Sequence, residues 1–342
     1  MKPLTYLFFT VGLWLTFACG NKQPASTTNP ATTTPAGKEA LASWRDGPLK
    51  QAIIAYVEKV TKDGSPDYIP PADRIATFDN DGTLWAERPY VQELFAIYQV
   101  KKMVAANPAL ANKQPFKAAV EHDKAWFEKG GEKALVEMVG ATHTGMTEDA
   151  FEAAAGSFFE NAQYPVLNKP VKEIVYQPQL ELLQYLRDNG FKTFICTGGT
   201  IEFVRAIAPA YYGIPKEQVI GTSFKYQFVD SNRTILRTPV LEHFNDKEGK
   251  PPGIQLHIGQ RPVFACGNEG GAGDIAMLKY CQSSRYPSFQ LLINHDDGDR
   301  EFAYQEKDSA SLKAAAQNKW HVVSMKDDWI NIFPTPSATQ KK

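Results

Sequence analysis

The sequence predicts an α/β fold in which a doubly wound parallel sheet, covered by helices on both faces, carries a helical insertion. Two observations lead to this fold class. Short apolar runs typical of buried strands alternate with helical patterns after residue 178, whereas residues 91–165 show helical patterns alone. Alternating strands and helices favour a parallel sheet with both faces covered. At 342 residues, the chain is long enough for a sizeable core and one or two domains.

Each element has its own signal in the sequence. An apolar stripe predicts a helix at 48–61. The expected strands are 75–78, 191–196, 262–266 and 289–294, and the later helices are 178–189, 201–208, 252–259, 275–281 and 309–319. The helical block divides into 91–105, 115–129, 132–139 and 147–160. Residues 219–244 alternate apolar and polar around a turn signal at 230–232, which predicts an inserted β-hairpin.

The first forty residues differ from the rest. The apolar run from Leu4 to Ala18 is shorter than the roughly 20 residues that span a bilayer, so it predicts a signal peptide over 1–19 rather than a membrane helix. The Ala-Cys junction resembles a bacterial lipoprotein cleavage site with Cys19 as the lipidated residue; an uncleaved signal anchor is the alternative. Residues 20–40 are rich in Thr, Pro, Ala and Asn, which predicts a disordered tether.

These features predict an exported protein of the periplasm or cell envelope, held at a membrane only through a lipid anchor at Cys19. A net charge of −1 and the absence of a dense basic stripe argue against a nucleic-acid partner. Disulfides are not expected either. Cys196 and Cys266 end two strand candidates that would lie about 9–10 Å apart on either side of the first strand, beyond the roughly 7 Å limit for a disulfide. With Cys281, they are interpreted as thiols.

The most informative segment is residues 78–84, Phe-Asp-Asn-Asp-Gly-Thr-Leu, directly after the strand 75–78. Asp79 and Asp81 lie two residues apart, so their side chains share one side of an extended backbone. Two carboxylates this close repel unless a cation lies between them, and Asp oxygens suit Mg²⁺. Gly82 permits a sharp turn, and Thr83 offers a hydroxyl and an N–H to an oxyanion. The alternative is an ordinary turn, since Asn, Asp and Gly dominate turns.

Three of the predicted strands end in polar or glycine-rich loops, at 79–81, 197–199 and 267–274. In open parallel sheets the site lies at the carboxyl ends of the strands. We therefore expect these loops to meet at one edge of the sheet, with the helical block as a lid over that edge.

The order of these motifs resembles the haloacid dehalogenase superfamily, specifically its phosphatase branch with a phosphoserine phosphatase-like helical cap. The resemblance covers about residues 70–325. It implies a Rossmann-like core made of residues 41–85 and 178–333, and a cap at 86–177. It also implies that Asp79 is a nucleophile that forms an aspartyl-phosphate.

The remaining roles follow from the same resemblance. Asp81 would be the acid and base, with its backbone carbonyl on Mg²⁺, and Thr197 would hydrogen-bond the phosphoryl group. Thr83 and Gly198 would help to bind substrate.

A lysine near the nucleophile completes the implied set. Lys250 precedes Pro251-Pro252 at the start of a helix and is correctly spaced from the acidic loop; Lys247 is the alternative. In the acidic loop, which carries additional glycine residues, Asp274 and Asn268 are the candidate metal ligands, with Glu269 as the alternative. The alternative for Asp274 is an N-cap of the helix that follows, a role that is compatible with metal binding.

The sequence therefore predicts a Mg²⁺-dependent phosphomonoester hydrolase that acts on a small phosphorylated metabolite. Alternatives are a binding protein with the same fold and weakened catalysis, and a phosphotransferase with an acceptor other than water. Trp85, Glu87 and Arg88 either face the substrate or pack at the hinge of the lid. The ester itself is left open among phosphoserine, phosphocholine, sugar phosphates and nucleotides, and no oligomeric state is predicted.

Overall fold

The computed structural model describes residues 40–335. The predicted signal peptide at 1–19 with Cys19, and the predicted tether at 20–40 except Ala40, lie outside the described residues. Within residues 40–335, every helix is too short or too polar to cross a lipid bilayer.

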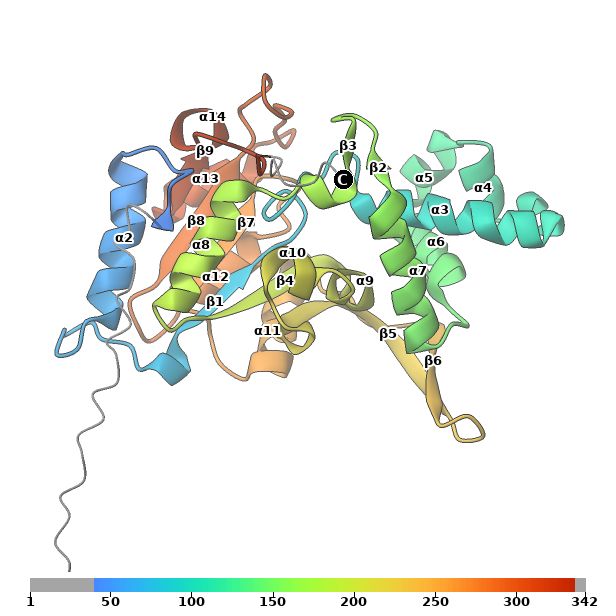
Figure 1. Ribbon diagram of the computed structural model, residues 1–342, viewed down its shortest axis with the longest axis horizontal. Coiled ribbons are helices and arrows are strands. Elements are labelled where there is room, and N and C mark those ends of the chain that lie inside the picture. The colour runs from blue at the N-terminus through green and yellow to red at the C-terminus, as the bar shows by residue number, and fades with distance from the viewer. Residues whose placement is uncertain (1–39, 336–342) are drawn as a thin grey trace, which may run out of the picture. The chain divides into compact units, whose positions relative to one another are not determined.

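The centre of the fold is a seven-stranded sheet with the order β6-β5-β4-β1-β7-β8-β9 (Figure 1). Its strands are β1 (Ile75–Phe78), β4 (Lys192–Thr200), β5 (Val219–Val229), β6 (Thr234–His243), β7 (Phe264–Asn268), β8 (Phe289–Asn294) and β9 (His321–Ser324). All neighbouring pairs are parallel except β5 and β6, which form an antiparallel hairpin. The predicted fold class, a mostly parallel sheet with a hairpin insertion, is confirmed.

Helices cover both faces of the sheet. Helices α2 (Pro48–Thr61) and α8 (Gln177–Asp188) pack on one face, in the same cluster as Ile195 of β4. Helices α11 (Lys250–Ile258), α12 (Ile275–Gln282) and α13 (Ala310–Asn318) pack on the other, with Cys196. Successive residues of a strand point to opposite faces, which explains why Ile195 and Cys196 belong to different clusters. Cys196, Cys266 and Cys281 are buried free thiols, as predicted.

The segment between β1 and α8 is mainly helical. It contains α3 (Val91–Ala106), α4 (Phe116–Val120), α5 (Lys124–Gly130), α6 (Glu132–His143) and α7 (Glu148–Asn161), followed by the two-residue strands β2 (Gln163–Tyr164) and β3 (Lys169–Pro170). The expectation of a single helix at 115–129 was wrong, because Asp123 interrupts it and accepts a hydrogen bond from the backbone of Trp126 as the N-cap of α5. The sequence also did not predict β2 and β3.

The helical insert rests on the core through aromatic side chains. Phe95 of α3 stacks on Phe203 at a centroid distance of 5.1 Å, and Phe158 of α7 lies 5.2 Å from Phe95. Phe203 belongs to α9 (Ile201–Arg205), which α10 (Ala208–Tyr212) follows. A single helix at 201–208 was expected, but α9 ends at Arg205 and a second short helix starts at Ala208. Pro209 lies in the first turn of α10, where its missing N–H leaves no helical hydrogen bond unmade.

Strand β1 sets the position of the loops that follow the strands. Phe78 pairs with Ile195 of β4 on one side and with Cys266 of β7 on the other. The backbone N–H of Asp79 donates to Cys266 O at 2.9 Å. The carboxyl ends of β1, β4 and β7 therefore meet at the same edge of the sheet. Strands β4 and β7 run further than predicted, so Thr197 and Gly267 are strand residues rather than the first residues of loops.

Candidate active site

The loop after β1 places two aspartates at the tip of the central strand. Asp79 is buried, and Asp81 is half-buried with its Oδ1 accepting a hydrogen bond from Trp85 Nε1 at 2.8 Å. Gly82 turns the chain with a φ of +70°, and a Cβ there would overlap the side chain of Asn268. Only glycine fits this position, because the backbone conformation and the space around it both exclude a side chain. The carbonyl of Gly82 is bonded to His295 Nε2 at 2.9 Å, which fixes the loop from the other side.

Lys250 joins the two acidic loops. Its Nζ, in a side chain that is 2% exposed, donates to Asp79 Oδ1 at 2.6 Å and also to Asp274 Oδ1. Asp274 Oδ2 in turn accepts the backbone N–H of Asn268 at 2.9 Å, which closes the glycine-rich loop. Asp274 stands at the N-cap position of α12, yet its side chain makes no capping hydrogen bond. The structure therefore places Lys250 against Asp79 and directs Asp274 into the site rather than to the helix.

The charges of this cluster do not balance. Burial and the nearby Asp274 raise the pKa of Asp79 well above its usual value, although Lys250 opposes the shift. Burial also raises the pKa of Asp81 and that of Asp274. Burial alone would lower the pKa of Lys250, but Asp274 and Asp79 outweigh it and hold that pKa above its usual value. Three carboxylates thus share one ammonium group, and the site can accept further positive charge.

The oxygen atoms in this cluster suit a hard divalent cation. Asn268 Oδ1 lies 3.2 Å from the backbone oxygen of Asp81 and 3.3 Å from Asp274 Oδ2. Such oxygens repel one another unless the amide is turned over or a cation lies between them. No group of three or more His, Cys, Asp or Glu side chains within residues 40–335 is arranged to hold a metal. A site here would use one or two carboxylates with amide and carbonyl oxygens, a set that fits Mg²⁺, which keeps several waters.

A cavity of about 440 Å³ opens in front of these groups. Its lining includes six of the residues selected from the sequence: Asp79, Asp81, Gly198, Lys250, Asn268 and Asp274. Thr83 and Thr197 are fully buried beside the cavity and are not among the residues that line it. Thr83 Oγ1 donates to Asn268 Oδ1 at 3.5 Å, and Thr197 Oγ1 accepts the N–H of Gly199 at 3.0 Å.

Lys247 and Glu269, the alternatives to Lys250 and to the metal ligands, do not line the cavity. Lys247 lies in the short 3₁₀ helix η5 (Lys247–Gly249). The carboxylate of Glu269 accepts the backbone N–H of Glu306. Glu87 does line the cavity; burial raises its pKa to about 7, and its Oε1 accepts the Tyr304 hydroxyl proton at 2.6 Å.

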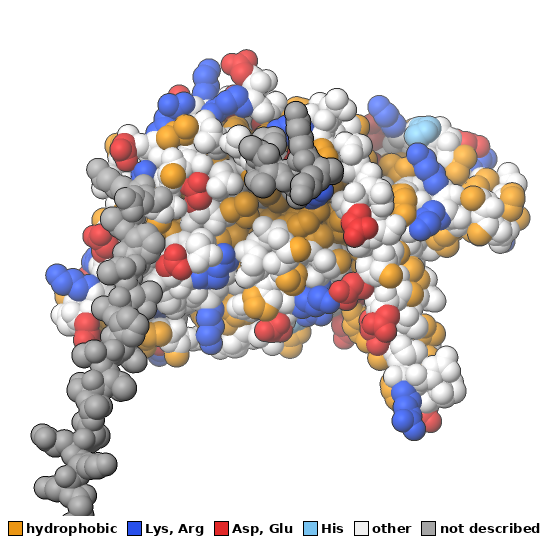
Figure 2. All heavy atoms as spheres, viewed as in Figure 1, with side chains coloured by type: hydrophobic (Ala, Val, Ile, Leu, Met, Phe, Trp, Pro, Cys, Tyr) orange, Lys and Arg blue, Asp and Glu red, His pale blue; other side chains and the backbone are white. Residues whose placement is uncertain are grey.

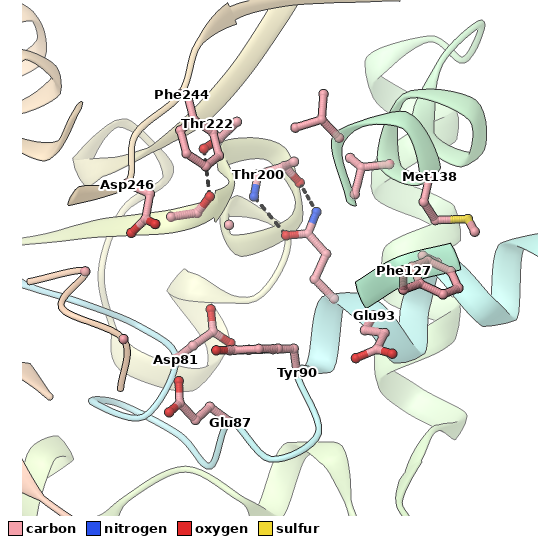
Figure 3. Close-up of a pocket in the computed structure, with 18 of the residues that line it drawn as sticks. Asp81, Glu87, Tyr90, Glu93, Phe127, Met138, Thr200, Thr222, Phe244 and Asp246 are labelled. Carbon is pink, nitrogen blue, oxygen red and sulfur yellow. Dashed lines mark hydrogen bonds between the residues drawn. The ribbon is translucent and has the colours of Figure 1, made fainter. Parts of the chain in front are cut away.

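Several residues of the site were not selected from the sequence. Gln92 of α3 bonds to Thr200 twice, donating from Nε2 to Oγ1 at 2.5 Å and accepting the backbone N–H at 2.9 Å (Figure 3). Asn245 donates to the carbonyl of Thr197 at 2.9 Å and so holds the carboxyl-terminal part of β4. Figure 3 also shows the hydroxyl end of Tyr90 pointing toward Asp81. No local pattern marks these residues, because their partners are distant in sequence.

The chain belongs to the haloacid dehalogenase-like hydrolases. The model of this family matches residues 76–279, more than half of the chain. No curated protein matches the sequence. Among solved structures, the chain is similar to a conserved protein of unknown function from Anaerococcus prevotii DSM 20548, with 16% identity, a TM-score of 0.56, and coverage of 81% of this chain and 91% of that one.

Two further similarities are weaker. A phosphoserine phosphohydrolase-like protein from Francisella tularensis subsp. tularensis SCHU S4 has 16% identity and a TM-score of 0.40, with coverage of 73% of this chain and 94% of that one. A substrate-bound phosphoserine phosphatase has 16% identity and a TM-score of 0.36, with coverage of 72% and 97%. At these identities, the likeness to the Anaerococcus protein supports the fold alone.

Proposed function

We propose that this protein is a Mg²⁺-dependent phosphomonoesterase that hydrolyses a small phosphate ester through an aspartyl-phosphate. One observation carries the proposal: Lys250 bridges Asp79 and Asp274 at the strand tip, where Asp81 also faces the cavity. Transfer of a phosphoryl group depends mainly on positioning and on cationic groups around its oxygens. Membership of the hydrolase family adds support.

In the first step, Asp79 acts as the nucleophile. Lys250 contacts Oδ1, so Oδ2 is the oxygen that attacks phosphorus while the bond from phosphorus to the ester oxygen breaks. Trp85 holds Oδ1 of Asp81, and Oδ2 delivers its proton to the departing oxygen. The raised pKa of Asp81 favours the protonated form that this step needs.

In the second step, Asp81 takes a proton from water as the water oxygen attacks phosphorus. The bond between phosphorus and Asp79 Oδ2 breaks, inorganic phosphate forms, and the carboxylate is restored. Lys250 and the backbone at Gly198 would bind the phosphoryl group from the cavity lining. Thr83 and Thr197 are buried outside that lining and would hold Asn268 and Gly199 in place through their hydroxyls. Glycine at position 198 lets the backbone approach the anion closely.

Mg²⁺ would be held by Asp79, the carbonyl of Asp81, and Asp274 with Asn268. It would reduce the repulsion between the carboxylates and an incoming phosphate. The helical segment 86–177 would serve as the cap that excludes bulk water from the cavity.

The test is phosphate release from simple esters with Mg²⁺ and with a chelator. We expect release that chelation abolishes and Mg²⁺ restores. Asp81→Asn should lose about 10²–10⁴-fold with an alkyl phosphate but much less with an aryl phosphate, whose leaving oxygen needs no proton. In that variant, the intact mass should show one trapped phosphoryl group, which Asp79→Asn removes. Two results would contradict the mechanism: phosphate release by the wild type that continues in the presence of the chelator, or a phosphoryl group trapped on a residue other than Asp79.

The proposal also places the protein outside the cytoplasm, anchored through Cys19, on the basis of the sequence. Cys19→Ser should move the protein from the membrane fraction to the soluble exported fraction. Retention in the membrane after this change would favour an uncleaved signal anchor.

A further inference from the structure

The cavity has two chemically different ends. We call the end formed by Asp79, Asp81, Asp274 and Lys250 the acidic end. At the opposite end, helices of the insert contribute apolar side chains, which we call the apolar end: Ile97 of α3, Phe127 of α5, and Val136, Met138 and Val139 of α6. Figure 3 shows Phe127 and Met138 well separated from Asp81 and Glu87.

The apolar end is formed by half-buried and buried side chains. Met138 is 5% exposed, and Ile97, Phe127, Val136 and Val139 are partly exposed. With the phosphoryl group at the acidic end, a leaving group that extends along the cavity would lie against these side chains. Burying apolar surface there is favourable, at roughly 0.8 kcal/mol per CH₂.

Three polar side chains of the cavity lining, those of Gln92, Thr200 and Thr222, are already hydrogen-bonded within the protein. Gln92 exchanges two hydrogen bonds with Thr200, and the hydroxyl of Thr222 donates to Gly198 O at 2.7 Å. The ionisable residues of the lining on the side of the insert, Glu93, His122 and Lys124, are exposed and can remain in water. A leaving group rich in hydroxyls would therefore give up water without gaining fixed partners, which is costly.

We propose that the leaving group of the substrate is apolar, so that the protein acts on monophosphate esters of alkyl or aryl alcohols rather than on sugar phosphates or phosphoserine. This inference rests on the proposed phosphatase function and defines the substrate class of the same site. The acidic end provides the chemistry, and the apolar end selects the ester by burying its hydrocarbon part.

The test uses a series of straight-chain alkyl phosphates from ethyl to hexyl, in which the chemistry of the leaving oxygen stays nearly constant. We expect kcat/KM to rise about fourfold per methylene until the cavity is filled. Glucose phosphate, phosphoserine and phosphocholine should react more slowly than the hexyl ester. Alkyl phosphonates of the same lengths, which cannot be hydrolysed, should show the same increase in affinity by calorimetry.

A pair of variants tests whether the named side chains cause the preference. Val139→Asn should lower the ratio of kcat/KM between hexyl and ethyl phosphate by at least about fivefold. Val166→Asn, the same change at a residue that is 59% exposed and outside the cavity, should leave the ratio unchanged. Circular dichroism verifies that both variants are folded, and the phosphonate affinities give the same comparison without turnover.

The outcomes separate this inference from the function on which it rests. Phosphate release that is flat along the series, or fastest with a sugar phosphate, phosphoserine or phosphocholine, overturns the apolar substrate and leaves the phosphatase intact. A ratio that Val139→Asn and Val166→Asn change equally overturns the role of the apolar end. No release from any ester, with no gain in phosphonate affinity along the series, overturns both proposals.

Discussion

The acidic end and the apolar end of the cavity are built in opposite ways. The acidic end crowds three carboxylates, from the segments after the parallel strands β1 and β7, around the buried lysine that starts α11. The apolar end assembles single side chains from several helices of the insert. The acidic end contains buried charged side chains that are bonded to one another, whereas the side chains that define the apolar end carry no charge. Under the proposed function, the acidic end would carry out the chemistry and the apolar end would select the ester, so that each could change without the other.

The outer surface is not divided into a charged region and an apolar region as the cavity is. On the face shown in Figure 2, Lys and Arg side chains are interspersed with Asp and Glu, in keeping with the net charge of −1. Concentrated charge is therefore a property of the cavity rather than of this face. We expect substitutions at the acidic end to have the largest effects on activity and stability, and a substitution in the insert to have a smaller one.

The largest effect is expected from Asp79→Asn. An amide cannot attack phosphorus, so turnover should fall by at least about 10⁴-fold. The fold should be as stable as the wild type or more so, because one of three crowded carboxylates is neutralised. Kinetics and urea unfolding measure the two results. Asp63→Asn, at an exposed aspartate, is the control; hydrolysis by Asp79→Asn at the normal rate would exclude the proposed nucleophile.

Lys250→Met should abolish activity and also destabilise the protein by about 3–5 kcal/mol, because it leaves buried carboxylates without a partner. Their pKa values would rise further in the folded state. The folded form with protonated carboxylates is intact at low pH, so the loss of stability should appear as pH rises above about 4.

The measurement is the free energy of unfolding in urea at several pH values. Lys192→Met, at an exposed lysine of β4, should change neither activity nor stability by more than about 0.5 kcal/mol. A loss of stability in Lys250→Met that is the same at every pH would mean that the lost packing, and not the unpaired charge, dominates.

His143, in the insert, tests whether the helical insert excludes a buried charge. It is buried in α6, its Nε2 has no hydrogen-bond partner, and it lies edge-on to Phe95 at 4.9 Å. Burial, with a contribution from Arg237, holds its pKa well below the usual value. Unfolded histidine takes up a proton below about pH 6.5 while the folded form does not, so stability should decrease as pH falls below 6.5.

The free energy of unfolding of the wild type should therefore fall between pH 6.5 and 5, and in His143→Phe this fall should be smaller by about 1–2 kcal/mol. Thermal unfolding over this range measures the effect. The exposed His257→Phe serves as the control for histidine content. An identical pH profile for wild type and His143→Phe would show that the insert tolerates a buried charge.

Local patterns predicted most of the core. The helix at 48–61 and the strand at 289–294 have the predicted bounds, because each has a strong apolar pattern with clear ends. Strand β9 was missed, since its four residues hold two exposed side chains and become a strand only by pairing with β8. The break at Asp123 was missed because the apolar pattern of 115–129 runs across it.

In the candidate site, too, some residues were predicted from the sequence and others were not. The order of the motifs brought Asp79, Lys250 and Asp274 into one hypothesis, and the structure places them in contact. Gln92 and the residues of the apolar end had no signal, because each acts through partners on other elements. Thr83 was selected for its hydroxyl and N–H beside the turn, and Thr197 from the motif order, and neither signal reveals that both side chains are buried.

The sequence by itself determined the strand that ends in Asp79 and Asp81, the turn at Gly82 and the alternation that makes a parallel sheet. These depend on interactions between near neighbours, namely backbone conformation and apolar periodicity. Only the tertiary structure decided that Lys250 bridges Asp79 and Asp274, and that Phe127 and Val139 face the same cavity. Such arrangements arise from packing between distant segments, whose favourable burial outweighs the entropy lost when the chain brings them together.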